Sequence, residues 1–302
     1  ALPILMNRLS EAREAAQRLF PPWEALDAGQ WAAPKEFSNA AKYAGLHADL
    51  AQLCTALPDD PRLELPGGPK LEAPLCLTYP SEGSIVIETS GEGSKQAVGA
   101  LNNIVLRLLA HSPPGRVNFT IFDPVGLGQN FAGIMHMADY EEQIINSRIW
   151  TQPPQIEEKL AELNEHMEKV IQMYLRNEYA TIAEYNAQAG VIAEKYHFLV
   201  VADFPNGFTD TAARRLLSIA ASGPRCGVYT LLHWDRRQAL PQDFPAADLR
   251  KAGVALAWRG SEFGIIGHAL DGAQIRLDAP ATPEKATDFI HTIGRASRDS
   301  SR

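Results

Sequence analysis

The stretch at residues 84–96 reads SIVIETSGEGSKQ. Its first half is an apolar run typical of a short buried strand, its second half is a turn with two glycines, and an apolar helix is predicted over 95–110. A glycine-rich turn between a strand and a helix can bind phosphate, because backbone N–H groups, a helix N-terminus and a lysine converge there. The residues that would form such a site are Gly91, Gly93, Ser94, Lys95 and Gln96.

The match to a P-loop is incomplete. That pattern is Gly, four residues, Gly-Lys and then Ser or Thr, whereas Thr89 and Ser94 take the places of the glycines here. Gln96 stands where the magnesium-binding hydroxyl belongs, and it also breaks the dinucleotide-binding fingerprint, while Glu92 adds a negative charge to the turn. The motif alone leaves two interpretations open: a phosphate-binding loop, or a strand-to-helix turn that uses glycine only for its conformation.

Strands and helices alternate along the rest of the chain. Further strands are predicted at 117–122, 197–202 and 227–232, and weaker ones at 254–258, 263–267 and 273–277. Helices are predicted at 155–175, 180–189 and 209–221, the last capped by Thr209, and a final helix begins at Pro283 with Thr282 as its N-cap. Continuous apolar strands that alternate with helices indicate an α/β fold with a mainly parallel sheet and helices on both faces.

The first 83 residues follow a different pattern. Residues 1–19 have apolar side chains at alternating steps of four and three, which fits either a coiled-coil seam or an amphipathic helix packed on its own domain. Residues 20–83 are rich in Pro, Gly and Trp, which predicts a lead-in segment of turns and short strands. We therefore divide the chain into 1–19, 20–83 and 84–302. It begins inside a helical pattern without a Met, which predicts a piece of a longer protein.

Composition excludes several classes of protein. Hydrophobic residues make up 45% of the 302 residues and charged ones 21%, which excludes a disordered chain. Neither a run of about 20 apolar residues nor a signal peptide is visible, so we predict a cytoplasmic protein without membrane contact. The three separated cysteines predict neither a disulfide framework nor a zinc site. A net charge of -8 disfavours nucleic-acid binding, which depends on clustered Lys and Arg.

The strand at 197–202 is followed by Asp203, where a Walker-B aspartate that orients magnesium would stand. Short motifs occur in order around it: Phe122-Asp123-Pro124, His136-Met137, His166-Met167-Glu168-Lys169, Arg176-Asn177, Ile182, Tyr185-Asn186, and Gly223-Pro224-Arg225-Cys226-Gly227-Val228-Tyr229. In their order and spacing, over roughly residues 84–240, the chain resembles the motor domains of FtsK/SpoIIIE-type DNA translocases. The resemblance implies a RecA-like P-loop fold, a place in a multi-domain ATPase, and ATP and Mg2+ as cofactors.

The departures from that family fall on its hydrolytic positions. The glycine before Lys95 and the hydroxyl after it are missing, and Phe204 replaces the Walker-B glutamate. The strand that would end in a γ-phosphate-sensing Gln reads LHWD at 232–235. Phosphoryl transfer depends on positioning and charge stabilisation, so these losses predict weak or no ATP hydrolysis and argue against bound ATP and Mg2+. Asp203 and Arg225 remain as catalytic candidates, Arg225 either as an arginine finger on a neighbour's nucleotide or as a structural residue.

We therefore expect a degenerate motor module with a structural, regulatory or partner-docking role. Its partners would be neighbouring motor modules or another protein, and DNA only in an assembled ring. The alternatives are an active ATP-dependent DNA translocase and a plain α/β ligand-binding domain outside this family. Four histidines lack the spacing of metal ligands and are expected to be core or surface residues: His136, His166, His197 and His233.

Overall fold

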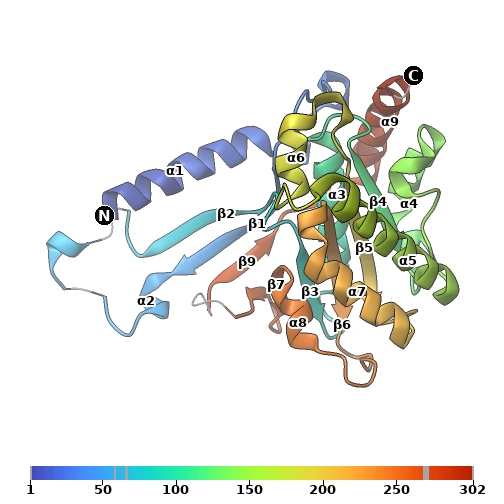
Figure 1. The fold of residues 1–302 in the computed structure, drawn as a ribbon. Helices are drawn as coiled ribbons and strands as arrows, with labels where there is room; N and C mark the ends of the chain where they lie inside the picture. The colour runs from blue at the N-terminus through green and yellow to red at the C-terminus, as the bar shows by residue number, and fades with distance from the viewer. Residues whose placement is uncertain (1, 58, 65–66, 268–271, 301–302) are drawn as a thin grey trace.

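The structure of the chain is a computed structural model that describes residues 2–57, 59–64, 67–267 and 272–300; residues 1, 58, 65–66, 268–271 and 301–302 lie outside the described part. Within the described ranges, nine strands form one sheet in the order β2-β1-β9-β8-β7-β3-β6-β5-β4 (Figure 1). The strands are β1 (Ala40–Asp49), β2 (Lys70–Thr78), β3 (Ile85–Thr89), β4 (Val117–Phe122), β5 (Tyr196–Phe204), β6 (Val228–Asp235), β7 (Val254–Trp258), β8 (Phe263–Ile265) and β9 (Gln274–Leu277).

The sheet has a parallel half and an antiparallel half. β7, β3, β6, β5 and β4 pair in parallel, as the alternation of strands and helices predicts. β8, β9, β1 and β2 extend this sheet through antiparallel pairs. The α/β class is confirmed, and the sheet is mixed.

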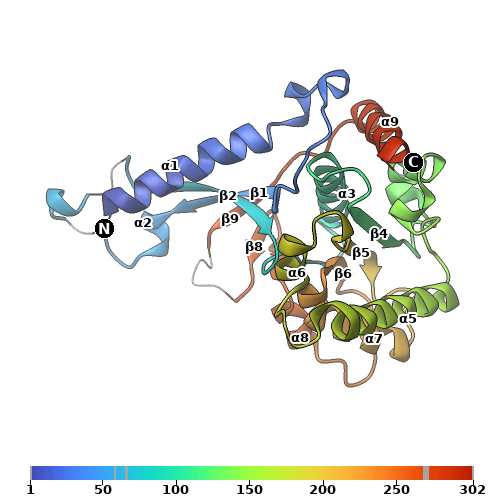
Figure 2. The same cartoon turned by 45° about the horizontal axis from the view of Figure 1, so that its top comes forward.

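Helices cover both faces of the parallel half (Figure 2). The side chains of β3 alternate between two cores: Ile85 and Ile87 pack with α3 and α9, whereas Val86 packs with α5, α7 and α8. The helices are α1 (Leu2–Leu19), α2 (Leu50–Leu53), α3 (Ser94–Ala110), α4 (Ala132–Met135), α5 (Pro153–Lys169), α6 (Ile182–Ala189), α7 (Asp210–Ser222), α8 (Ala246–Lys251) and α9 (Pro283–Ser300).

Most of the predicted boundaries lie within two residues of those observed. Thr209 caps α7 by accepting a hydrogen bond from the backbone N–H of Ala212, and Thr282 accepts one from Lys285 before α9. The predicted helix over 155–175 is divided, because α5 changes into a π-helix at Val170–Leu175. β5 extends to Phe204, so Asp203 lies within the strand.

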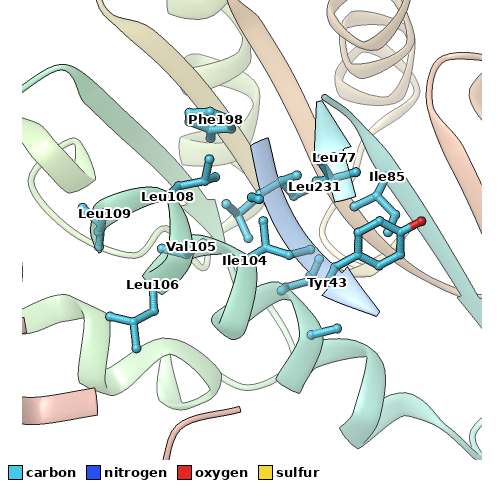
Figure 3. Packing of buried hydrophobic residues seen from close by; sticks show 14 of the residues in the cluster. Tyr43, Leu77, Ile85, Ile104, Val105, Leu106, Leu108, Leu109, Phe198 and Leu231 are labelled. Carbon is cyan, nitrogen blue, oxygen red and sulfur yellow. The ribbon is translucent and has the colours of Figure 1, made fainter. Parts of the chain in front are cut away.

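The prediction of only turns and short strands in 20–83 was wrong. β1 has ten residues and β2 has nine, and the two pair with each other along the edge of the sheet. Tyr43 of β1 and Leu77 of β2 pack in the same core as Ile104 of α3 (Figure 3). The Pro and Gly residues at 58–69 suggested that the whole segment lacks long elements, but they lie in the connection between β1 and β2. The small residues of β1, such as Ala41 and Ala44, form its buried face but give a weak apolar pattern.

The helix at the N-terminus, α1, lies along β2 (Figures 1 and 2). In the apolar stripe predicted for this helix, Ala16 is buried and Leu9 is half-buried, whereas Leu5 and Leu19 are exposed. Phe20 follows the helix and is buried against the ring of His111.

Candidate functional site

The carboxyl ends of three neighbouring strands bring the predicted loop and Asp203 to one edge of the sheet. β6 lies between β3 and β5, and its register places Asp235 beside Thr89 and Trp234 beside Phe204. Parallel strands end at the same edge, which is where open α/β sheets bind ligands. The glycine turn, residues 90–93, connects β3 to α3 at this edge.

Two glycines give this turn its backbone conformation. Gly91 has a φ of 102° and Gly93, the residue before α3, has a φ of 82°. Both angles lie in the left-handed region that favours glycine over other residues. The conformational interpretation of these glycines is therefore sufficient to account for them, whether or not a phosphate binds.

His233 links three of the motif positions through hydrogen bonds. It is fully buried, and its Nε2 lies 2.8 Å from Thr89 Oγ1, which lies 3.1 Å from Ser94 Oγ. Its Nδ1 accepts from the backbone N–H of Asp203 at 3.3 Å and lies 3.2 Å from the Asp203 carboxylate. The tautomer of the ring decides which of its two nitrogens donates a hydrogen bond and which accepts one. The strand end, the helix start and the Walker-B position are thus joined to one another by protein groups.

A basic side chain lies against the glycine turn. Arg237 donates from Nε to Asp235 Oδ1 at 3.0 Å and from Nη2 to Oδ2 at 2.9 Å, which is a bidentate pair. A β-carbon built on Gly91 would lie 3.1 Å from Nη1 of Arg237. An anion at the turn would have to compete with Asp235 for this guanidinium.

An indole ring covers the other end of the turn. A β-carbon built on Gly93 would lie 2.8 Å from Cδ2 of Trp258, so the ring packs directly against the start of α3. The indole N–H of Trp258 also points to Glu92 Oε2, at the long distance of 3.5 Å. Gly93 is required both for its φ and for this close approach.

A buried carboxylate lies two residues before the turn, in β3. Glu88 is only 1% exposed and accepts hydrogen bonds from Nε and Nη2 of Arg250, while Arg236 Nε lies 3.7 Å from it. The guanidinium of Arg250 also stacks over the Trp234 ring at 4.9 Å. A buried charge needs a partner, and this ion pair connects α8 to the carboxyl end of β3.

The remaining hydrolytic positions face either the core or the solvent. Phe204 is fully buried and packs against Phe208 and Phe244, with ring centroids 5.1 Å and 5.6 Å away. Lys95 and Gln96 are exposed in the first turn of α3. The residues present therefore do not fit a site that hydrolyses ATP with Mg2+. Position 96 has no hydroxyl group, and the side chain of Phe204 points into the core. We derive no hydrolytic step from them.

Arg225 lies at the opposite edge of the sheet. It is exposed in the short turn Pro224–Cys226, which precedes β6, whereas the glycine turn lies beyond the other end of that strand. Eight strand residues span about 26 Å at roughly 3.3 Å each, so Arg225 does not reach the loop of its own chain. A role on a neighbour's nucleotide stays a prediction.

No protein-family model matches the sequence, and no curated protein matches it. Solved structures do match the fold. EssC (ATPases 2 and 3) from Geobacillus thermodenitrificans superposes with a TM-score of 0.62 at 15% identity over 89% of this chain. The cytoplasmic domain of the type VII secretion ATPase EccC from Thermomonospora curvata gives 0.61 at 18% identity over 94%. The chain has the fold of an FtsK/SpoIIIE-type ATPase domain. This confirms the resemblance noted in the motifs at the level of the fold.

The chain is shorter than these neighbours. It covers 51% of the EssC chain and 34% of the EccC chain. A further EccC structure, of ATPases 2 and 3 in complex with a signal sequence peptide, has a TM-score of 0.53 at 15% identity, and the chain covers 49% of it. One copy of this fold therefore corresponds to about half of a chain that carries two ATPase domains.

Replacing Asp235 by asparagine should lower the free energy of unfolding modestly at neutral pH. The hydrogen bonds from Arg237 hold the pKa of Asp235 below its ordinary value, so the folded state binds a proton less readily than the unfolded state. The contribution is therefore complete above the ordinary aspartate pKa and is lost as the pH falls through the lowered one. Urea denaturation of wild type and Asp235→Asn across this range should give curves that converge in acid. The exposed Asp59→Asn serves as control, and a difference that persists at low pH would refute the electrostatic explanation.

Two histidines that are far apart in the sequence lie next to each other in the structure. The rings of His166 in α5 and His197 in β5 lie 4.2 Å apart, next to Glu194. Burial and the neighbouring His197 lower the pKa of His166 to about 4, so its ring is neutral at pH 7. The expectation that these are core or surface histidines stays a prediction, and their proximity was not visible in the sequence because residues on separate elements leave no local spacing pattern. His233 is a core histidine, as expected.

The sequence motifs do not identify the side chains that surround the glycine turn: Glu88, Arg237, Arg250 and Trp258. One signal was available, since a glutamate at the end of a buried apolar strand needs a cationic partner. Which arginine supplies it is a matter of tertiary structure.

Among the described helices, none is both long and apolar enough to cross a bilayer.

Proposed function

We propose that this chain is a degenerate FtsK/SpoIIIE-like motor module of a larger multi-domain ATPase. It would bind nucleotide weakly or not at all, and it would dock neighbouring motor modules or a partner protein. The single observation that carries this proposal is the set of protein contacts at the loop, where His233 joins Thr89 to Asp203. Because these protein groups bind one another at the loop, they support a module that does not hold ATP and Mg2+ as a working motor would.

The neighbouring structures support the docking role. They are ATPases with more than one such domain, and one EccC structure holds a signal sequence peptide. A module of such a protein can act by holding its neighbours or by binding a peptide without hydrolysing ATP itself. We also propose a cytoplasmic location, which is supported by the similarity to a cytoplasmic domain of EccC.

We expect no ATP hydrolysis above background, with or without duplex DNA. The physical reason is that Gln96 offers no magnesium hydroxyl and Phe204 no carboxylate. The measurement is an ATP titration with and without Mg2+, followed by a phosphate-release assay with and without DNA. DNA should also bind weakly, since a chain of net charge -8 can contact few phosphates.

Lys95→Ala is the decisive variant for this assay, with the exposed Lys70→Ala as its matched control. Both should behave as wild type. Turnover that is stimulated by DNA and abolished in Lys95→Ala alone would replace the proposal with the alternative of an active DNA translocase.

A further inference from the structure

Three potential metal ligands from separate elements meet at the amino end of β5. His166 lies on α5, Glu194 precedes β5, and His197 is its second residue. Each can offer one ligand atom such that all three atoms lie within 4.8 Å of one another. This edge of the sheet is opposite the glycine turn, so the cluster is separate from the candidate nucleotide site.

We propose that His166, Glu194 and His197 bind a zinc ion. Two imidazole nitrogens and a carboxylate oxygen are a ligand set that Zn2+ uses, with a fourth position left for water or another ligand. The expected Zn–N distance of about 2.0–2.1 Å puts tetrahedral ligand atoms about 3.4 Å apart. Because all three ligand atoms already lie within 4.8 Å of one another, the side chains need to close by at most about 1.4 Å, on the order of one small rotamer adjustment.

The cluster contains polar atoms that the folded chain leaves unsatisfied. Nε2 of His166 and Nε2 of His197 are both buried without a hydrogen-bond partner in the part of the chain that the structure describes. Glu194 Oε1 accepts from the backbone N–H of Lys195 at 3.2 Å and lies 3.9 Å from His197 Nε2, which is too long for a hydrogen bond to that ring. Buried polar groups normally have partners, and a cation placed between these side chains would supply one to both ring nitrogens.

Asn118 adds a third buried atom without a partner to the same cavity. Its Oδ1 is also buried without a partner, and it lies directly opposite His197 in the register of β4 and β5. Asn118, His166 and His197 line one cavity of about 380 Å³. The cavity gives a metal ion an entry path and gives its fourth position room for water or for the Asn118 amide oxygen.

The surroundings hold the backbone of one ligand in place and pair the ammonium group of Lys159 with a carboxylate. Asn186 holds the backbone of Glu194 by accepting from its N–H at 2.8 Å and donating to its C=O at 2.9 Å. Lys159, which also lines the cavity, directs its ammonium group to Glu162 at 2.8 Å. Such supporting contacts around the ligands are typical of metal sites. The ion would fasten α5 to the start of β5, and its role would be structural.

The experiment is a competition titration of the whole chain with Zn2+ and a chromophoric chelator, in a Cys54→Ser background because Cys54 is exposed. We expect one Zn2+ per chain. His166→Gln and His197→Gln should each weaken binding by at least about 100-fold, because losing a ligand costs more than losing a supporting contact. The exposed His136→Gln is the matched control and should leave the affinity unchanged.

A measurement on the unaltered ligands keeps the test independent of how the variants fold. Co2+ in place of Zn2+ should give the visible bands of a four-coordinate site with nitrogen and oxygen ligands. Absence of stoichiometric binding at micromolar Zn2+, a thiolate charge-transfer band, or full affinity in a folded His166→Gln/His197→Gln variant would each overturn the proposal.

Discussion

Phe204→Glu is expected to lower the free energy of unfolding by at least about 4 kcal/mol. Loss of a buried phenylalanine ring alone costs about 3–5 kcal/mol, and the new carboxyl group would be buried among the rings of Phe208 and Phe244. In a working motor of this fold a glutamate follows the Walker-B aspartate, so this substitution restores the motif by sequence. The structure predicts that it damages the core instead. Urea denaturation followed by circular dichroism measures the effect.

Phe204→Leu is the control, because it changes shape without burying a charge. It should cost about 1–2 kcal/mol. A Phe204→Glu chain as stable as wild type would show that position 204 can turn toward the loop. If that chain also gained magnesium-dependent ATP hydrolysis, the degenerate-motor proposal would have to be replaced by that of a motor lacking a single residue.

The protein contacts at the glycine turn also affect any attempt to restore the P-loop motif by substitution. Ser94→Gly and Gln96→Ser lie at a half-buried and an exposed position, so the fold can accept them. They would nevertheless leave Arg237 against Gly91 and His233 bonded to Thr89. Restored nucleotide affinity therefore requires displacement of protein groups as well as recovery of the motif.

Elements with strong local signals could be predicted from the sequence, and elements with weak ones could not. β4 and β7 were predicted to the residue, because each is a mostly apolar segment bounded by charged or glycine residues. β1 was missed because alanine and glycine fill much of its length, and only its pairing with β2 and β9 makes it a strand. Strand formation by small residues depends on neighbours that are distant in sequence.

The candidate site likewise has parts that could be predicted from the sequence and parts that could not. The loop, Asp203 and the substituted hydrolytic positions were visible as departures from a motif. The side chains that surround the loop could not be predicted from the sequence, since Trp258 and Arg237 lie more than a hundred residues after the glycines that they contact. The pairing of His166 with His197 depends likewise on α5 packing beside β5. Chemistry carried by separate elements becomes predictable only when the topology is known.

Arg250→Met should lower the free energy of unfolding by about 3 kcal/mol. It removes the main partner of Glu88, whose carboxylate is 1% exposed, and among the described residues it leaves Arg236 at 3.7 Å as the nearby cation. Breaking a buried ion pair from one side typically costs about 3–5 kcal/mol, and Arg236 should bring the cost to the lower end. Methionine retains much of the arginine's apolar contact with Trp234, so the loss of charge dominates the measured change.

The double variant Glu88→Met/Arg250→Met separates the pair from the packing around it. If the cost of Arg250→Met comes from an uncompensated buried carboxylate, removing that carboxylate should recover all but about 1 kcal/mol of the stability. A double-mutant cycle from thermal or urea denaturation gives the coupling energy directly. Equal stabilities for the single and double variants would mean that Arg250 acts through its stacking on Trp234. In that case the pair with Glu88 would not be what holds α8 to the end of β3.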